Sequence, residues 1–116
     1  MLYIFESEIF ENKSLIYGLR SIFGIGQKQS SIICKKLGFS NTLKVKSLSK
    51  DQINQLIKYI EFMNLIISSD LRQKIILKKK SLISIKSYRG IRRSLGFPIR
   101  GQRTHTNAKT AKKRRS

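Results

Sequence analysis

Acidic side chains are scarce in this chain of 116 residues, and none follows Asp70. Only 6 Asp and Glu side chains stand against 25 Lys and Arg side chains, which gives a formal net charge of +19 at pH 7. A surplus of this size repels itself in a compact monomer and favours a polyanionic partner. The composition therefore indicates nucleic acid, an anionic membrane surface or an acidic protein as the partner.

Cysteine and histidine are also nearly absent, since Cys34 and His105 are each the only residue of their kind. One cysteine excludes an internal disulfide, and this pair cannot assemble a structural zinc site. We therefore expect no metal and no cofactor. Cys34 is expected to pack in a helix. His105 is expected to be exposed or to contact RNA, because no cysteine or carboxylate lies near it in the sequence to complete a catalytic group.

Long apolar runs are missing as well. The longest uninterrupted run is Met1 to Phe5, whereas about 20 residues are needed to span a bilayer, so no membrane partner is expected. Residues 1–30 lack the basic start and apolar stretch of a signal peptide, and Glu6, Glu8 and Glu11 are unlike an Arg-rich transit sequence. If the protein works in an organelle, we expect its gene to be in that organelle.

The charges that are present are distributed unevenly along the chain. Residues 1–70 hold nine basic and six acidic side chains, a net of +3, and residues 71–116 hold sixteen basic and no acidic ones, a net of +16. From Tyr88 onward apolar residues become sparse, and such a segment cannot bury enough surface to fold alone. We therefore expect a helical domain over residues 1–87 and a long, basic, extended RNA-binding arm over residues 88–116.

Apolar residues recur at helical spacing four times in the first 87 residues, whereas only residues 2–10 suggest a strand. The first helix is expected over residues 15–23, because two closely spaced glycines follow it. The second is expected over residues 27–37, with Gly38 as its C-terminal cap. The fold class is expected to be all-α.

The third and fourth helices carry recognisable start signals. Ser49 and Gln52 have the spacing of a capping box, which satisfies free N–H groups at the start of a helix. Asp70 and Gln73 have the same spacing and predict a second capped start. One face of the fourth helix is basic, and the other is expected to turn inward with Leu71, Ile75, Ile76, Leu82 and Ile83.

Two features of the helical region are candidate phosphate contacts. In the turn at Gly24 and Gly26, bare backbone N–H groups at a helix start favour a phosphate that a Cβ would obstruct, and Lys28 adds charge. A helix–helix turn that merely needs glycine is the alternative interpretation. The run Lys78-Lys79-Lys80 is either a solvated helix face or a phosphate contact, and its continuation into the acid-free half of the chain favours phosphate.

The segment from Tyr88 to Thr104 has the most specific composition. Four glycine and proline residues are expected to hold it irregular, and five arginines present planar forks suited to phosphate and to base stacking. Such segments suit folded RNA, which proteins recognise by shape, backbone and splayed bases. A disordered Arg/Gly tail is the alternative, against which the interspersed Leu95, Phe97 and Ile99 argue.

This region also carries a family resemblance. Two stretches, Tyr88-Arg89-Gly90-Ile91-Arg92 and Gly96-Phe97-Pro98-Ile99-Arg100-Gly101-Gln102-Arg103-Thr104-His105-Thr106-Asn107-Ala108-Lys109, closely resemble the signature of ribosomal protein S-thirteen of the small subunit. The resemblance extends upstream through residues 21–26, 48–49, 52–53 and 70–72, and it covers about residues 9–113. The chain departs from the family pattern at Tyr3, Glu6 and Phe10, which stand where a basic residue, a glycine and a proline are usual.

The resemblance implies a helix-two-turns-helix domain with an extended C-terminal tail, in the head of the small ribosomal subunit. It implies binding to small-subunit rRNA, contact with the neighbouring protein S-nineteen, contact with a large-subunit protein at an inter-subunit bridge, and a tail near the peptidyl-site tRNA. Residue patterns and resemblance together give as candidate RNA-binding residues Gly24, Gly26, Lys28, Lys78, Lys79, Lys80, Arg89, Arg92, Arg93, Arg100, Gln102, Arg103, Thr104, Asn107 and Lys109. The residues expected near tRNA are Lys112, Lys113, Arg114 and Arg115.

Similarity to organelle-encoded members of the family indicates a mitochondrial ribosome, with chloroplast or bacterial cytoplasm as alternatives. Two other classes of protein compete with a structural ribosomal protein. A DNA-repair glycosylase or nuclease shares the helix-two-turns-helix module, but the basic half has no carboxylate for catalysis. A free architectural DNA-binding protein is compatible with the composition, and only the signature argues against it.

Overall fold

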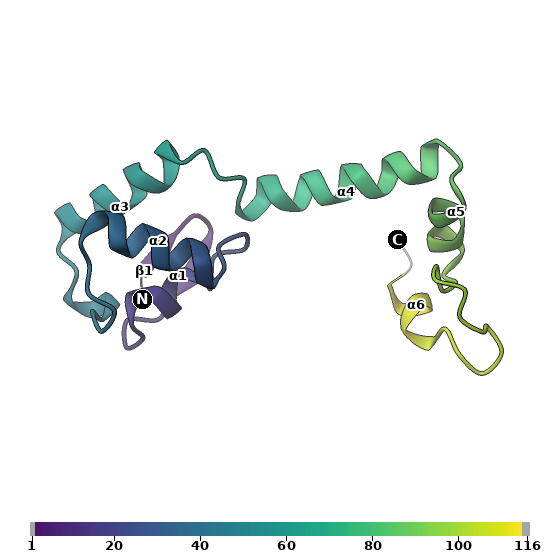
Figure 1. Ribbon diagram of the computed structural model, residues 1–116, viewed down its shortest axis with the longest axis horizontal. Coiled ribbons are helices and arrows are strands. Elements are labelled where there is room, and N and C mark those ends of the chain that lie inside the picture. The colour runs from purple at the N-terminus through teal and green to yellow at the C-terminus, as the bar shows by residue number, and fades with distance from the viewer. Residues whose placement is uncertain (1, 115–116) are drawn as a thin grey trace. The chain divides into compact units, whose positions relative to one another are not determined.

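The structure, a computed structural model, describes residues 2–114 and is mostly helical (Figure 1). Residue contacts divide the chain into two compact units, one ending at Arg72 and the other beginning at Gln73. The all-α fold class is confirmed, with one small two-stranded sheet in addition. The boundary expected after Ser87 differs from this division, and it stays a prediction about which parts fold independently.

The first unit opens with a short β-hairpin in the region where the sequence suggested a strand. β1 (Leu2–Ile4) pairs antiparallel with β2 (Ser7–Ile9). Phe5 and Glu6 form the two-residue turn, with φ angles of 48° and 62°. Two positive φ angles in succession are those of a type I′ turn, whose twist matches that of the flanking strands.

Three helices form the body of the first unit: α1 (Leu15–Leu19), α2 (Gln27–Leu37) and α3 (Lys50–Phe62). A short 3-10 helix, η1 (Val45–Ser47), precedes α3, and α2 packs against both α1 and α3. The largest apolar side chains that are fully buried are Ile9, Leu15, Leu19, Ile22, Ile33, Leu56 and Ile60. Because burying one such side chain stabilises a fold by about 1.5–3 kcal/mol, this cluster holds the unit together.

The ends of α2 and α3 lie where the sequence predicts them. Gly38 closes α2 in the left-handed conformation, at φ 75°. At the start of α3 the capping box is complete: the Gln52 N–H donates to Ser49 Oγ, and the Ser49 N–H donates to Gln52 Oε1 at 3.0 Å. The expected end of the first helix was wrong. α1 stops at Leu19, because Ser21 Oγ donates to the Gly18 carbonyl at 2.6 Å, and such a local side-chain bond competes with helix continuation.

The expected capped start of the fourth helix at Asp70 was also wrong. α4 (Ser68–Ser84) begins two residues earlier, and Asp70 lies in its first turn. Ser68 has a φ of 52° and is tied to two distant parts of the unit. Its N–H donates to the Phe23 carbonyl and its Oγ to the Phe5 carbonyl, each at 2.7 Å. Long-range hydrogen bonds, rather than local spacing, therefore set the start of this helix.

α4 does not bury the apolar face that its spacing predicts. The side chains of Ile75, Ile76 and Leu77 are 38%, 48% and 65% exposed. Leu71 packs beside the glycine turn of the first unit, and Leu82 lies against Gly90 in the second. Between these two places, the apolar side chains of α4 stay largely open to solvent in the described part of the chain.

The second unit corrects the expectation of an irregular, extended arm. α5 (Tyr88–Leu95) and α6 (Lys109–Lys113) form within it. Ser87 caps α5, since its Oγ accepts from the Gly90 N–H at 3.2 Å, and Gly96 ends the helix at φ 78°. Of the glycines expected to keep this segment irregular, Gly96 does end a helix, whereas Gly90 is buried within α5.

Candidate RNA-binding surface

The second unit carries basic side chains that no Asp or Glu of the same unit neutralises, because no acidic residue follows Asp70. Most of those cations that the structure describes are exposed to solvent. Of the sequence-predicted residues in this unit, the exposed ones are Lys78, Lys80, Arg89, Arg100, Gln102, Arg103, Thr104, Asn107, Lys109, Lys112, Lys113 and Arg114. Lys79, Arg92 and Arg93 are half-buried. Arg115 lies outside the described residues.

The glycine turn before α2 separates the two interpretations that the sequence left open. Gly24 has a φ of 107°, and a Cβ there would press on Ile67 and Leu71, so the fold itself requires glycine at this position. Gly26 is different, because it is the N-cap of α2 in an extended conformation and a Cβ there would meet nothing within 4 Å. Packing within the chain therefore does not require glycine at Gly26, and the phosphate contact expected there, with Lys28 exposed close by, stays a prediction.

Arg92 makes contacts with other residues of the chain itself. Its guanidinium carbon lies 4.7 Å from the centre of the Phe97 ring and 5.9 Å from that of Tyr88. Its Nε donates to the Pro98 carbonyl at 3.2 Å. These contacts fasten the segment after α5 back onto the helix. The sequence predicts for Arg92 the same RNA contact as for its neighbours, whereas the structure adds these contacts within the chain.

Arg93, the next residue, lines a pocket of about 250 Å³ in the second unit. Arg100, Gln102 and Arg114 line the same pocket, so the structure brings four of the sequence-predicted residues together. The apolar part of the lining comes from Phe97, Pro98, Ile99 and Ala111. This pocket therefore combines cationic forks with an apolar wall, the combination that single-stranded RNA recognition uses.

The remaining candidates lie in the irregular segment between α5 and α6. Asn107 Nδ2 donates to the Arg103 carbonyl at 3.0 Å and so shapes this segment. His105 is exposed, and the described residues contain no group of three or more His, Cys, Asp or Glu side chains that would hold a metal. Cys34 is buried in the first unit, as expected, and burial raises the pKa of its thiol. None of the described helices is long and apolar enough to cross a membrane.

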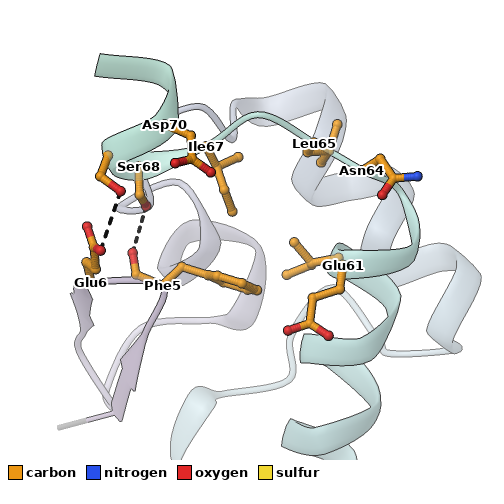
Figure 2. A pocket seen from close by; sticks show the side chains of 10 residues that line it. Phe5, Glu6, Glu61, Asn64, Leu65, Ile67, Ser68 and Asp70 are labelled. Carbon is orange, nitrogen blue, oxygen red and sulfur yellow. Dashed lines mark hydrogen bonds between the residues drawn. The ribbon is translucent and has the colours of Figure 1, made fainter. Parts of the chain in front are cut away.

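The first unit has a pocket of opposite character, about 420 Å³ in volume, between the hairpin turn, the end of α3 and the start of α4 (Figure 2). Phe5, Ile60, Leu65 and Ile67 supply its apolar lining. Three of the six acidic residues of the chain also line it, namely Glu6, Glu61 and Asp70. No sequence pattern indicates this cluster, because its members come from three separate segments that only the fold brings together.

A small helical chain with this much uncompensated positive charge is typical of structural ribosomal proteins, which carry no catalytic machinery. Comparison with known proteins agrees. The model of the family described as ribosomal protein S13/S18 matches residues 3–110. The chain therefore belongs to this family of structural, non-enzymatic proteins of the small ribosomal subunit, as the signature at residues 88–109 predicted.

Relatives cover almost the whole chain. "Small ribosomal subunit protein uS13m" of Marchantia polymorpha is 46% identical over 115 residues, which is 99% of this chain and 95% of the relative. The protein of the same name in Schizosaccharomyces pombe is 40% identical over 97% of this chain and 74% of its own length. "Small ribosomal subunit protein uS13" of the bacterium Hydrogenobaculum is 40% identical over 90% of this chain and 82% of the relative. The final letter of the first name marks mitochondrial proteins.

Proposed function

We propose that the chain is a structural constituent of the small subunit of a mitochondrial ribosome, and that its second unit binds small-subunit rRNA in the head of that subunit. The observation that carries this proposal is the unneutralised charge of the second unit, because residues 73–116 hold fifteen basic side chains and no acidic one, a net of +15. Neutralising crowded phosphates releases condensed counterions, and this release drives binding. Family membership supplies the ribosome as the assembly in which this happens.

The candidate contacts divide by chemistry. The exposed lysines, such as Lys78, Lys80 and Lys109, act as point charges on phosphate, whereas the arginines add planar forks that pair with two phosphate oxygens at once. The turn at Gly26 and Lys28 contributes a contact from the first unit. The end of the chain is proposed to approach the peptidyl-site tRNA through Lys112 and Lys113 of α6 and the following Arg114 and Arg115.

Contacts with proteins are assigned to the first unit. Its acid-lined pocket repels RNA phosphates, and its apolar lining suits a basic protein segment that carries an apolar side chain. We assign it to a neighbouring ribosomal protein, with protein S-nineteen as the partner that the family resemblance implies. Contact with a large-subunit protein at an inter-subunit bridge is proposed for the same unit.

Two charge reversals test the assignment of RNA binding to the second unit. Arg100→Glu and Lys50→Glu each change the net charge by the same amount at an exposed position, one in the second unit and one in α3. After sedimentation of mitochondrial extract through a high-salt gradient, we expect the unmodified chain and Lys50→Glu to migrate with the small subunit and Arg100→Glu to be depleted there. Equal incorporation of both variants would refute the assignment, and recovery of the unmodified chain at the top of the gradient would refute the ribosomal role.

A further inference from the structure

The pocket at Arg93 is formed by two helices and the segment between them. α5 supplies Arg93, the segment after it supplies Phe97 to Arg100 and Gln102, and the end of the chain supplies Ala111 in α6 and Arg114 just beyond it. A second hollow of about 300 Å³ adjoins it and shares Pro98, Gln102, Ala111 and Arg114. Residues separated in sequence thus line one depression with two compartments.

Arg93 carries a hydrogen-bond donor in this depression that has no acceptor within the described part of the chain. Its Nε is buried and has no hydrogen-bond partner among the described residues. The Nε of its neighbour Arg92 donates to the Pro98 carbonyl at 3.2 Å. Leaving a buried N–H donor unpaired costs free energy, so such a group calls for an acceptor that the chain itself does not supply.

The chemistry of the lining specifies the ligand. Arginine offers only donors, Gln102 offers both a donor and an acceptor, and Phe97 with Pro98 and Ile99 offers an apolar surface. A ligand that fits must therefore be anionic, accept hydrogen bonds, and carry a flat apolar part. A nucleotide has all three properties, but a base in a paired helix cannot enter a pocket, so the nucleotide must be unpaired.

We propose that this depression receives a single unpaired nucleotide of rRNA, with its base against Phe97 and Pro98 and its phosphate or base edge on the guanidinium groups of Arg93 and Arg100. The proposal rests on the proposed function, since it specifies how one part of the RNA-binding unit recognises RNA. Arg92 then acts as a positioning residue, because it holds Phe97 and the Pro98 carbonyl in place.

Filling the pocket without changing charge is the direct test. Ala111→Phe places a ring in the half-buried lining, and Ser81→Phe adds the same ring at an exposed position of α4 that lines no part of the depression. The probes are short RNA stem-loops that are identical except for one bulged A, C, G or U, together with a fully paired stem and a stem with an abasic bulge. Affinities are measured with the full-length chain at fixed salt.

We expect the unmodified chain and Ser81→Phe to bind at least one bulged stem about 5- to 150-fold more tightly than the paired and abasic stems, the range expected for stacking of one base. Ala111→Phe should abolish this preference and leave the affinity for the paired stem unchanged. Equal binding of all stems by the unmodified chain, or an undiminished preference in Ala111→Phe, would overturn the nucleotide pocket alone. Failure of the unmodified chain to bind any of these RNAs would refute the proposed RNA binding as well.

Discussion

Gly90 is the position at which a single methyl group should do most damage to the second unit. It lies inside α5, where glycine is otherwise unfavourable, and it is buried. A Cβ on Gly90 would overlap the carbonyl group of Leu82 and approach the Ile83 nitrogen to 2.8 Å. All of these atoms are backbone of α4, which cannot rotate aside as a side chain can. Gly90→Ala must therefore push α5 away from α4.

The size of the effect follows from three contributions. Overpacking of this kind typically costs about 1–3 kcal/mol. Displacement of α5 also loosens Ser87, whose Oγ donates to the Leu82 carbonyl at 2.9 Å and accepts from the Gly90 N–H, and each such bond contributes about 0.5–1.5 kcal/mol. The better helix propensity of alanine offsets about 1 kcal/mol of this. Because the two bonds are loosened rather than broken, their cost and the gain in helix propensity roughly cancel, and we expect a net loss of about 1–3 kcal/mol in the docking of α5.

Hydrogen exchange of backbone amides measures this loss locally. A loss of about 1–3 kcal/mol should speed exchange of the α5 amides by roughly 5- to 150-fold, since about 1.4 kcal/mol corresponds to a factor of ten. Exchange in α2 and α3 should be unchanged. Ser94→Ala is the control, because it also raises helix propensity in α5 but removes only an exposed hydrogen bond to the Ile91 carbonyl. If α5 exchanges equally slowly in Gly90→Ala and Ser94→Ala, the close approach of the two helices is not what requires glycine.

Three further predictions concern RNA binding and the internal contacts that hold the RNA-binding segment in place. Gly26→Ser introduces a favoured N-cap residue at a position where a Cβ has no neighbouring atom within 4 Å. Thermal denaturation should therefore show that the variant is at least as stable as the unmodified chain. Its affinity for an rRNA fragment should nevertheless fall, because the added side chain obstructs the phosphate. Unchanged affinity would leave Gly26 without a phosphate contact. Arg92→Lys keeps the charge but loses the bond to the Pro98 carbonyl and the stacking on Phe97. It should speed exchange of the Phe97 amide, which donates to the Arg92 carbonyl at 2.9 Å, and leave the salt dependence of RNA binding unaltered. Finally, if roughly six to ten basic side chains contact phosphate, affinity for an rRNA fragment should fall about 10³- to 10⁵-fold between about 50 and 200 mM salt, as titrations would show and a flat response would contradict.

Local sequence signals predicted the parts of the fold that local interactions determine. The capping box at Ser49 and the cap at Gly38 depend only on residues within a few positions of each other, and both are confirmed. The start of α4 was mistaken because Ser68 is held by the Phe23 and Phe5 carbonyls, the latter 63 positions away. No pattern of nearby residues reports such a bond.

Gly90 shows a second limit of local signals. A glycine in a segment rich in glycine and arginine ordinarily breaks a helix, so the sequence of this segment predicts an irregular arm. The structure places Gly90 where a helix passes very close to Leu82, so the same residue permits a helix instead of ending one. Composition predicts that the segment is basic and suited to RNA. It cannot predict that α4 packs this closely against α5, because that contact depends on the tertiary structure.

Arg92 and Arg93 show the same limit in the candidate site. Consecutive residues of a helix point about 100° apart, so two adjacent arginines leave the helix in different directions. Arg92 meets Phe97 and Pro98, whereas Arg93 lines the pocket with its Nε unpaired. The sequence assigned both to RNA because residue type alone does not give direction.

The distribution of acidic side chains bears on how the first unit meets RNA. Glu6, Glu61 and Asp70 surround one pocket, and a phosphate backbone brought against it would be repelled. The hollow beside the N-terminus of α2 shares no lining residue with this pocket, and its only charged side chains are Lys28 and Lys35. Within the first unit, RNA is therefore expected at the start of α2 and a basic protein segment at the acid-lined pocket. The small net charge of residues 1–70 thus conceals at least two local sites of opposite sign.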